Sequence, residues 1–170
     1  MIVFGKSVSL YVRFLRPILG FILVVGIVRL LLSLAGVSVA SVRFFSLTGA
    51  WFVGLVFASI SVHTKGFGSY KQLLALVGVQ SLVAQAFTAA VVVLAIVTGQ
   101  DNIYSIPEYS GGADGKTWGH AGAHLFLAAP ILTLAGWLIG SAILFVTKKA
   151  VPADTTGNSV PKSKARGAGA

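Results

Sequence analysis

The sequence has 170 residues, of which 56% are hydrophobic and only 10% are charged. A soluble domain carries about 25% charged residues, so this composition excludes a soluble enzyme, a fibrous protein and a conventional nucleic-acid-binding domain, and it is typical of a membrane protein. The sequence contains no cysteine, which excludes disulfides, iron–sulfur clusters, thiolate-bound zinc and covalently attached haem.

The first segment, residues 1–16, mixes apolar side chains with Lys6, Arg13 and Arg16. This pattern favours an amphipathic helix that lies on the cytoplasmic membrane surface with its cations among the lipid headgroups. Pro17 would then stand in the first turn of the following helix, where proline is tolerated. The alternative is that residues 1–16 are a frayed extension of that helix.

Four apolar stretches are each long enough, at roughly 20 residues, to cross the hydrocarbon core as a helix. They cover residues 17–39, 44–62, 72–98 and 125–146. We therefore predict an all-α polytopic membrane protein: a four-transmembrane-helix bundle over residues 17–147 with a long outer loop between helices 3 and 4. Small residues recur along these stretches and predict close contact between the helices.

The lysines and arginines predict the orientation of the bundle. Ten of the thirteen lie before the first span, between the second and third spans, or after the fourth. Because basic residues are retained in the cytoplasm, we expect both termini to be cytoplasmic and the protein to lie in a bacterial inner membrane. The formal net charge of +9 is explained by this sorting and by anionic lipid, without nucleic acid as a partner.

The last segment, residues 148–170, has no aromatic residue and is rich in glycine, proline and cations. It is expected to be a disordered basic cytoplasmic tail, because it cannot bury enough apolar surface to fold. Near the other end, Ser38 and Ala40 follow an apolar stretch as small residues do before a signal-peptidase site. Whether residues 1–40 are removed stays open at this point.

Arg29 is the only charged residue inside a predicted span, and it is expected near the middle of that span. A cation in the hydrocarbon core costs at least about 2.5–3.5 kcal/mol, and the other spans contain no acidic residue that could pair with it. Three interpretations follow: the side chain snorkels to the lipid headgroups, it contacts a partner subunit or a ligand, or the span boundary is misplaced.

The longest connection, residues 99–124, is the most informative. Loops longer than about 12–15 residues are usually functional or disordered. Tyr104, Tyr109 and Trp118 lie in this connection, where aromatic residues favour the membrane interface. We expect residues 103–109 to fold back over the outer mouth of the bundle, and these aromatic side chains to form its outer contact surface.

His120 and His124 are four residues apart, so on a helix their side chains share one face. This spacing suits two ligands of one metal ion, with Glu108, Asp101 or Asp114 as a candidate third ligand, or the ligands of a haem or pigment. The other interpretations are that the two histidines make ordinary interfacial hydrogen bonds, or that they handle protons. The sequence does not require a cofactor.

Residues 61–85 read SVHTKGFGSYKQLLALVGVQSLVAQ. A helix there ends in a basic turn rich in glycine and serine, and Tyr70, Lys71 and Gln72 open the next span. This segment resembles bacterial Yip-type integral membrane domains. The resemblance implies a scaffold or assembly role and no catalytic residue. That family usually has five spans, and the outer loop and the histidine pair do not belong to its pattern.

Motifs for catalysis are missing: the sequence has no phosphate-binding glycine loop, no serine–histidine–acid set and no group of intramembrane acids. We therefore predict a non-enzymatic membrane protein, an accessory subunit or scaffold of a membrane complex that contacts lipid and either other membrane subunits or a second copy of itself. One alternative is a membrane protein that binds a metal, haem or pigment through the histidine pair. Another is a small transporter, for which only Arg29, Gln80 and Gln85 indicate a polar path.

Overall fold

The computed structural model describes residues 1–109 and 112–151. These residues are mostly helical, and four of the helical segments are long and apolar enough to cross a membrane. The elements in chain order are β1 (Ile2–Val3), β2 (Lys6–Ser7), α1 (Val8–Leu34), α2 (Val39–Val42), α3 (Leu47–Thr64), α4 (Tyr70–Thr98), the 3-10 turn η1 (Pro107–Tyr109), α5 (Trp118–Ala123), the π-helical turn η2 (His124–Ala128) and α6 (Ala129–Ala150). Most of the expected cytoplasmic tail, residues 152–170, lies outside the described residues.

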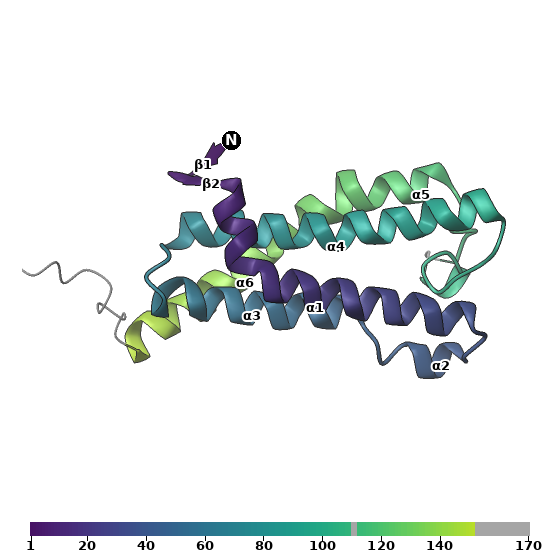
Figure 1. Ribbon diagram of the computed structural model, residues 1–170, viewed down its shortest axis with the longest axis horizontal. Helices are drawn as coiled ribbons and strands as arrows, with labels where there is room; N and C mark the ends of the chain where they lie inside the picture. Colours follow the sequence, from purple (N-terminus) through teal and green to yellow (C-terminus); the bar gives the residue numbers. More distant parts are fainter. Residues whose placement is uncertain (110–111, 152–170) are drawn as a thin grey trace, which may run out of the picture.

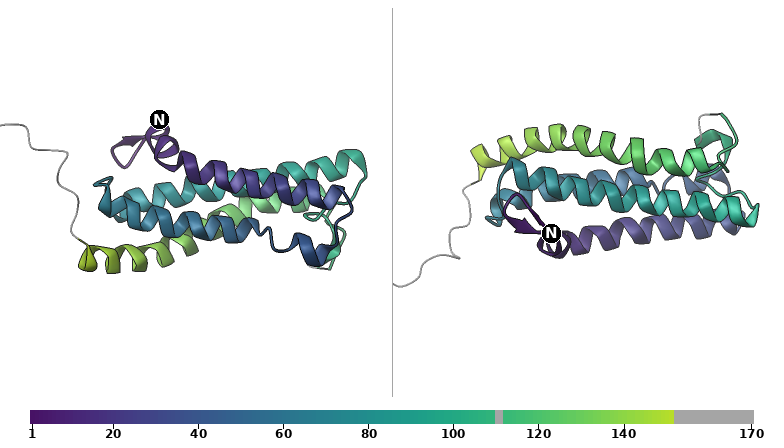
Figure 2. Two further views of the ribbon diagram at one scale, coloured as in Figure 1. Left: turned by 60° about the horizontal axis from the view of Figure 1, so that its bottom comes forward. Right: turned by 90° about the horizontal axis from the view of Figure 1, so that it is seen from above.

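The long helices form a bundle with α3 and α4 in the middle, α1 on one side and α6 on the other (Figure 2). The strands, the connection between α3 and α4, and the end of α6 lie together at one end, which we call the terminal end (Figure 1). Helices α2 and α5 and the connection 99–117 lie at the opposite end, which we call the loop end (Figure 1).

The first long helix has different limits from the first predicted span. It begins at Val8, where the Ser7 side chain accepts a hydrogen bond from a backbone N–H of the first turn. Residues 8–16 are therefore continuous with the span, and these first turns run at an angle to the rest of α1 (Figure 1). Pro17 provides the physical reason, because a proline inside a helix removes one hydrogen bond and crowds the preceding turn. The helix ends at Leu34, because Gly36 adopts a φ of +75°.

A short β-hairpin precedes α1, which the all-α prediction did not include. Phe4 and Gly5 form its turn with φ values of +48° and +80°, as a two-residue hairpin turn requires. The Tyr11 hydroxyl donates to the Val3 carbonyl at 2.9 Å, and the Gln72 side chain donates to the Phe4 carbonyl at 3.1 Å. The hairpin is thus attached to both α1 and the start of α4.

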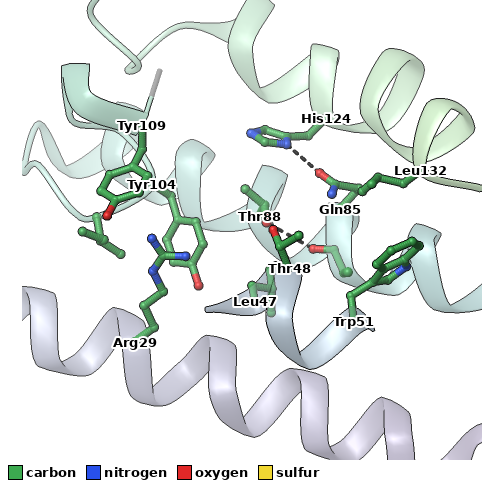
Figure 3. Close-up of a pocket in the computed structure, with 12 residues that line it drawn as sticks. Arg29, Leu47, Thr48, Trp51, Gln85, Thr88, Tyr104, Tyr109, His124 and Leu132 are labelled. Carbon is green, nitrogen blue, oxygen red and sulfur yellow. Dashed lines mark hydrogen bonds between the residues drawn. The ribbon is translucent and has the colours of Figure 1, made fainter. Parts of the chain in front are cut away.

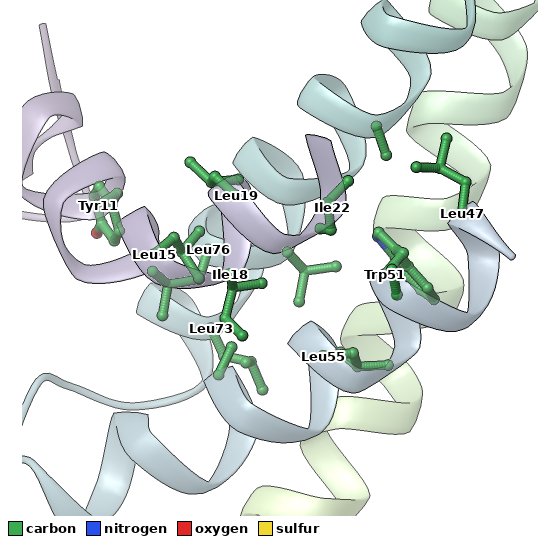
Figure 4. Close-up of a cluster of buried hydrophobic side chains, with 14 of the residues drawn as sticks. Tyr11, Leu15, Ile18, Leu19, Ile22, Leu47, Trp51, Leu55, Leu73 and Leu76 are labelled. Carbon is green, nitrogen blue, oxygen red and sulfur yellow. The ribbon is translucent and has the colours of Figure 1, made fainter. Parts of the chain in front are cut away.

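The apolar core fills the space between the helices (Figure 4). Its largest fully buried apolar side chains include Tyr11, Leu15, Ile22, Leu55, Leu73 and Leu76. Small residues allow the close contacts that the sequence predicts: a Cβ atom on Gly54 would lie 2.4 Å from Ile18, and one on Gly136 would lie 2.7 Å from the Trp51 ring. Such contacts stabilise helix association in lipid, where burial of apolar surface gives little advantage.

Candidate anion site and histidine pair at the loop end

A cavity of about 130 Å³ lies at the loop end, between the four long helices, the connection 99–117 and the turn η2 (Figure 3). Among residues 1–109 and 112–151, its lining includes several polar side chains and no aspartate or glutamate. The lining residues are Arg29, Leu47, Thr48, Trp51, Ala84, Gln85, Thr88, Ile103, Tyr104, Tyr109, His124 and Leu132. The site therefore combines one permanent cation with neutral hydrogen-bonding groups.

Arg29 extends from α1 into this cavity and is only 8% exposed. Its guanidinium carbon lies 5.0 Å from the centre of the Tyr104 ring and 4.9 Å from that of Tyr109, and Figure 3 shows the guanidinium beside both rings. Within residues 1–109 and 112–151 it forms no ion pair and no hydrogen bond, and its Nε atom is buried without a partner. The two rings offer cation–π attraction, but the positive charge is not balanced.

The position of Arg29 along its helix corrects the expectation that it lies mid-span. Because α1 ends at Leu34, Arg29 lies about 7.5 Å from the helix end at a rise of 1.5 Å per residue. Helix α1 therefore ends five residues before the predicted end of the first span. The charge lies near the mouth of the bundle rather than at the middle of the helix.

The connection 99–117 packs against α1 and α4 at the loop end. The backbone N–H of Ile103 donates to the Ser33 hydroxyl of α1 at 2.8 Å, and the Asn102 side chain donates to the Val91 carbonyl of α4 at 3.2 Å. Ile103 and Tyr104 are buried as a result. These contacts fix the segment that covers Arg29.

Tyr104 does not neutralise Arg29. Burial raises the pKa of the Tyr104 phenol to about 12, although the Arg29 charge opposes this shift. The hydroxyl is therefore protonated at neutral pH, and it donates a hydrogen bond to the Gly26 carbonyl at 3.4 Å. The cavity consequently keeps the full positive charge of its arginine.

The histidine pair lies beside this cavity, and its rings are in direct contact. The Nε2 atoms of His120 and His124 are 3.2 Å apart, and their ring centres are 4.9 Å apart. The Nδ1 atom of His120 lies 2.8 Å from the Gly115 carbonyl oxygen. The Nδ1 atom of His124 lies 2.7 Å from Oε1 of Gln85 on α4 (Figure 3). Each ring is therefore held in place by a hydrogen bond at its Nδ1 atom, on the side away from the other ring.

A π-helical turn positions His124. The Ala129 N–H bonds to the His124 carbonyl, five residues back rather than four. Pro130 follows immediately; it lacks an N–H, and its ring would crowd the carbonyl of Phe126 in a regular α-helix. The wider turn relieves this crowding, and it changes the direction of His124 relative to α6. Turns of this kind are frequent at functional sites.

Two predicted site residues lie apart from the cavity. Trp118 is 67% exposed at the start of α5, and Glu108 is exposed in η1. Within residues 1–109 and 112–151, no group of three or more His, Cys, Asp or Glu side chains could hold one metal ion. The prediction of Glu108 as a third ligand beside the histidines is therefore wrong, because η1 directs Tyr109 rather than Glu108 to the cavity.

Three polar residues of the cavity, Thr48, Gln85 and Thr88, were not predicted as site residues. Gln85 was considered as a polar group within a span, and Thr48 was not considered. A glutamine inside an apolar span was the available signal for Gln85, since polar groups in spans usually bond to another helix. No family model, curated protein or solved structure matches the chain. Its interpretation therefore depends on this geometry.

Proposed function

We propose that the chain is a non-enzymatic integral membrane protein that binds a small anionic group of the carboxylate or phosphate type at the loop end of its bundle. The observation that carries this proposal is the buried, unpaired guanidinium of Arg29 in the wall of a cavity without acidic residues. A planar guanidinium matches the geometry of a carboxylate or phosphate, to which it can donate two parallel hydrogen bonds.

The energetics of burial support an anion as the occupant. An uncompensated charge in a poorly hydrated site is costly, and a hydrogen-bonded counter-charge offsets that cost. Tyr104 is a neutral phenol, so the counter-charge has to come from outside the described residues. The cavity of about 130 Å³ is small compared with the roughly 300–1,000 Å³ of pockets that hold drug-sized ligands. We therefore expect one small acid or one headgroup.

Thermal unfolding in mild detergent tests the proposal. Acetate and phosphate are titrated against the wild type at constant ionic strength, with Arg29→Leu as the test variant and Arg43→Leu as the control. Arg43 is an exposed cation at the same end of the bundle. We expect saturable stabilisation of the wild type and of Arg43→Leu, and none of Arg29→Leu. Equal responses in all three proteins would contradict a specific site.

A second candidate function is the accessory subunit or scaffold that the sequence predicts. It is favoured by an apolar groove beside α4 that is lined by Ala86, Ala89, Ala90 and Gly122, because small residues allow another helix to approach closely. The Yip-type resemblance of residues 61–85 implies the same role. Blue-native electrophoresis after mild extraction tests it, since a strictly monomeric chain without a co-purifying partner would contradict it.

We further propose a bacterial inner membrane with both termini in the cytoplasm. The distribution of charge supports this orientation: apart from Arg29, the described cations toward the loop end are Arg43 and Lys116. The described cations toward the terminal end are Lys6, Arg13, Arg16, Lys65, Lys71, Lys148 and Lys149. Retention of basic residues in the cytoplasm then places the candidate anion site on the outer face.

A further inference from the structure

The two histidines at the loop end differ from an ordinary hydrogen-bonded pair in the protonation that their neighbours require. The Nδ1 atom of His120 faces the Gly115 carbonyl oxygen, and that of His124 faces the amide oxygen of Gln85. With the Gln85 amide oriented so that Oε1 faces His124, both oxygens can only accept, and each Nδ1 atom then carries a proton. A neutral imidazole has one N–H, and each Nε2 atom therefore presents a lone pair.

These two lone pairs converge. The Nε2 atoms are 3.2 Å apart, and two lone pairs at that distance repel each other unless a cation lies between them. Two imidazole nitrogens bound at 2.0–2.1 Å to one tetrahedral zinc ion are about 3.3 Å apart. The observed separation therefore matches that of two ligands on a single metal ion.

The outer edges of the rings agree with this interpretation. A histidine that binds a metal ion usually donates its second N–H to a carbonyl or carboxylate oxygen, which fixes the tautomer and the ring orientation. Gly115 and Gln85 do this for His120 and His124, one from the connection and one from α4. The connection thus fixes the orientation of the His120 ring, and α4 fixes the orientation of the His124 ring.

We propose that His120 and His124 chelate one divalent transition-metal ion of the zinc or copper class through their Nε2 atoms. Imidazole ligands suit these ions, whereas Mg²⁺ and Ca²⁺ prefer oxygen ligands. The described residues supply no third His, Cys, Asp or Glu ligand, so the remaining coordination positions are open to water or an exchangeable ligand. Both histidines are partly exposed at the loop end, so neither imidazole is enclosed by the surrounding side chains.

The test uses the full chain in detergent, purified without a polyhistidine tag and stripped with chelator. Zinc bound per chain is measured by elemental mass spectrometry, and its effect by thermal unfolding, with Mg²⁺ as the ionic control. We expect one zinc ion per chain and a rise in the unfolding temperature with zinc alone. His120→Ala and His124→Ala should each lose most of the binding, and the double variant should lose no more, because the site is shared.

Three control variants sharpen the result. His63→Ala should bind zinc normally, because His63 lies at the terminal end, where its Nε2–H donates to the Val151 carbonyl at 2.9 Å. Gln85→Leu should weaken zinc binding by about 10–100-fold, as the loss of a partner that orients a ligand does. Arg43→Leu should also bind zinc normally, because Arg43 is an exposed cation at the loop end that lines neither the cavity nor the histidine pair.

A measurement on the wild type avoids variants that fail to fold. Diethyl pyrocarbonate modifies accessible imidazole nitrogens, and mass spectrometry locates the modified residues. Zinc should protect His120 and His124 and leave His63 as reactive as before. Absence of zinc binding, binding retained in the double variant, or equal protection of all three histidines would overturn the proposal. The first outcome would mean that a shared proton, rather than a metal ion, joins the two rings.

Discussion

The guanidinium carbon of Arg29 lies 5.0 Å from the centre of the Tyr104 ring. The Tyr104 hydroxyl in turn donates to the carbonyl of Gly26, on the same helix as Arg29. Helix α1 and the connection 99–117 are therefore joined at two neighbouring points. The cation and the loop that covers it position each other, and a change in either should alter the other.

The Tyr104 phenol provides a direct measurement of this coupling. Because burial raises its pKa to about 12, the absorbance of the wild type near 295 nm should include a late component in alkaline titration. Tyr104→Phe should remove that component, and Tyr109→Phe should keep it. A wild type whose tyrosines all titrate near pH 10 would contradict the buried position of Tyr104.

Stability should follow the same titration. The unfolded chain loses the phenol proton near the ordinary pKa of about 10, whereas the folded chain keeps it up to about 12. The contribution of Tyr104 is thus fully present below pH 10 and is lost as the pH rises to 12, by about 2–3 kcal/mol in total. Between pH 10 and pH 12, the unfolding temperature of the wild type should fall more steeply than that of Tyr104→Phe.

Replacing Arg29 by leucine should not reduce the amount of protein in the membrane, and can increase it. The substitution removes a charge from an apolar helix; the cost is about 2.5–3.5 kcal/mol at a helix centre and smaller toward the end of α1, where Arg29 lies. Leu31→Arg is the matched control, because Leu31 is exposed on the same helix and the new charge should lower the yield. Quantitative immunoblots of membrane fractions measure both. A lower yield of Arg29→Leu would instead mean that the bundle depends on the cation.

The glycine contacts predict a large difference between two identical substitutions. Gly136→Ala places a Cβ atom 2.7 Å from the Trp51 ring, whereas Gly20→Ala meets nothing within 4 Å. We expect Gly136→Ala to lose about 1–3 kcal/mol, the usual cost of overpacking, and Gly20→Ala to be neutral. Unfolding in mixed micelles compares them, and equal stabilities would contradict the close contact between α3 and α6.

The orientation can be tested with single cysteines, because the chain has none of its own. Asp114 lies at the loop end and Lys65 at the terminal end, and both are exposed. Each is replaced by cysteine in a separate variant. In intact spheroplasts, a membrane-impermeant maleimide should label Asp114→Cys and spare Lys65→Cys. The reverse pattern would place the candidate anion site in the cytoplasm.

The four spans could be predicted because each is a long apolar run, and a helix is the way such a run satisfies its backbone in lipid. Their ends could not, since they depend on single backbone states. Gly36 adopts a positive φ and ends α1 at Leu34 rather than at residue 39. The initial hairpin turns at Phe4-Gly5, which lacks the usual asparagine–glycine signal.

Several individual residues of the candidate site could be predicted from the sequence, but their meeting in one cavity could not. Arg29 stood out as a charge in an apolar span, and Tyr104 and His124 as polar or aromatic residues in the long connection. Their meeting in one cavity depends on how the helices pack and on where the connection folds back. The partner of His124 was least predictable, because Gln85 reaches it only through the π-helical turn before Pro130.

That turn amounts to one extra residue in an otherwise regular helix. A one-residue deletion between His124 and Ala128 would remove it, but the deletion would also return the Pro130 ring to the crowding that the wider turn relieves. The proline and the extra residue therefore depend on each other, and loss of one should be tolerated only together with replacement of the other.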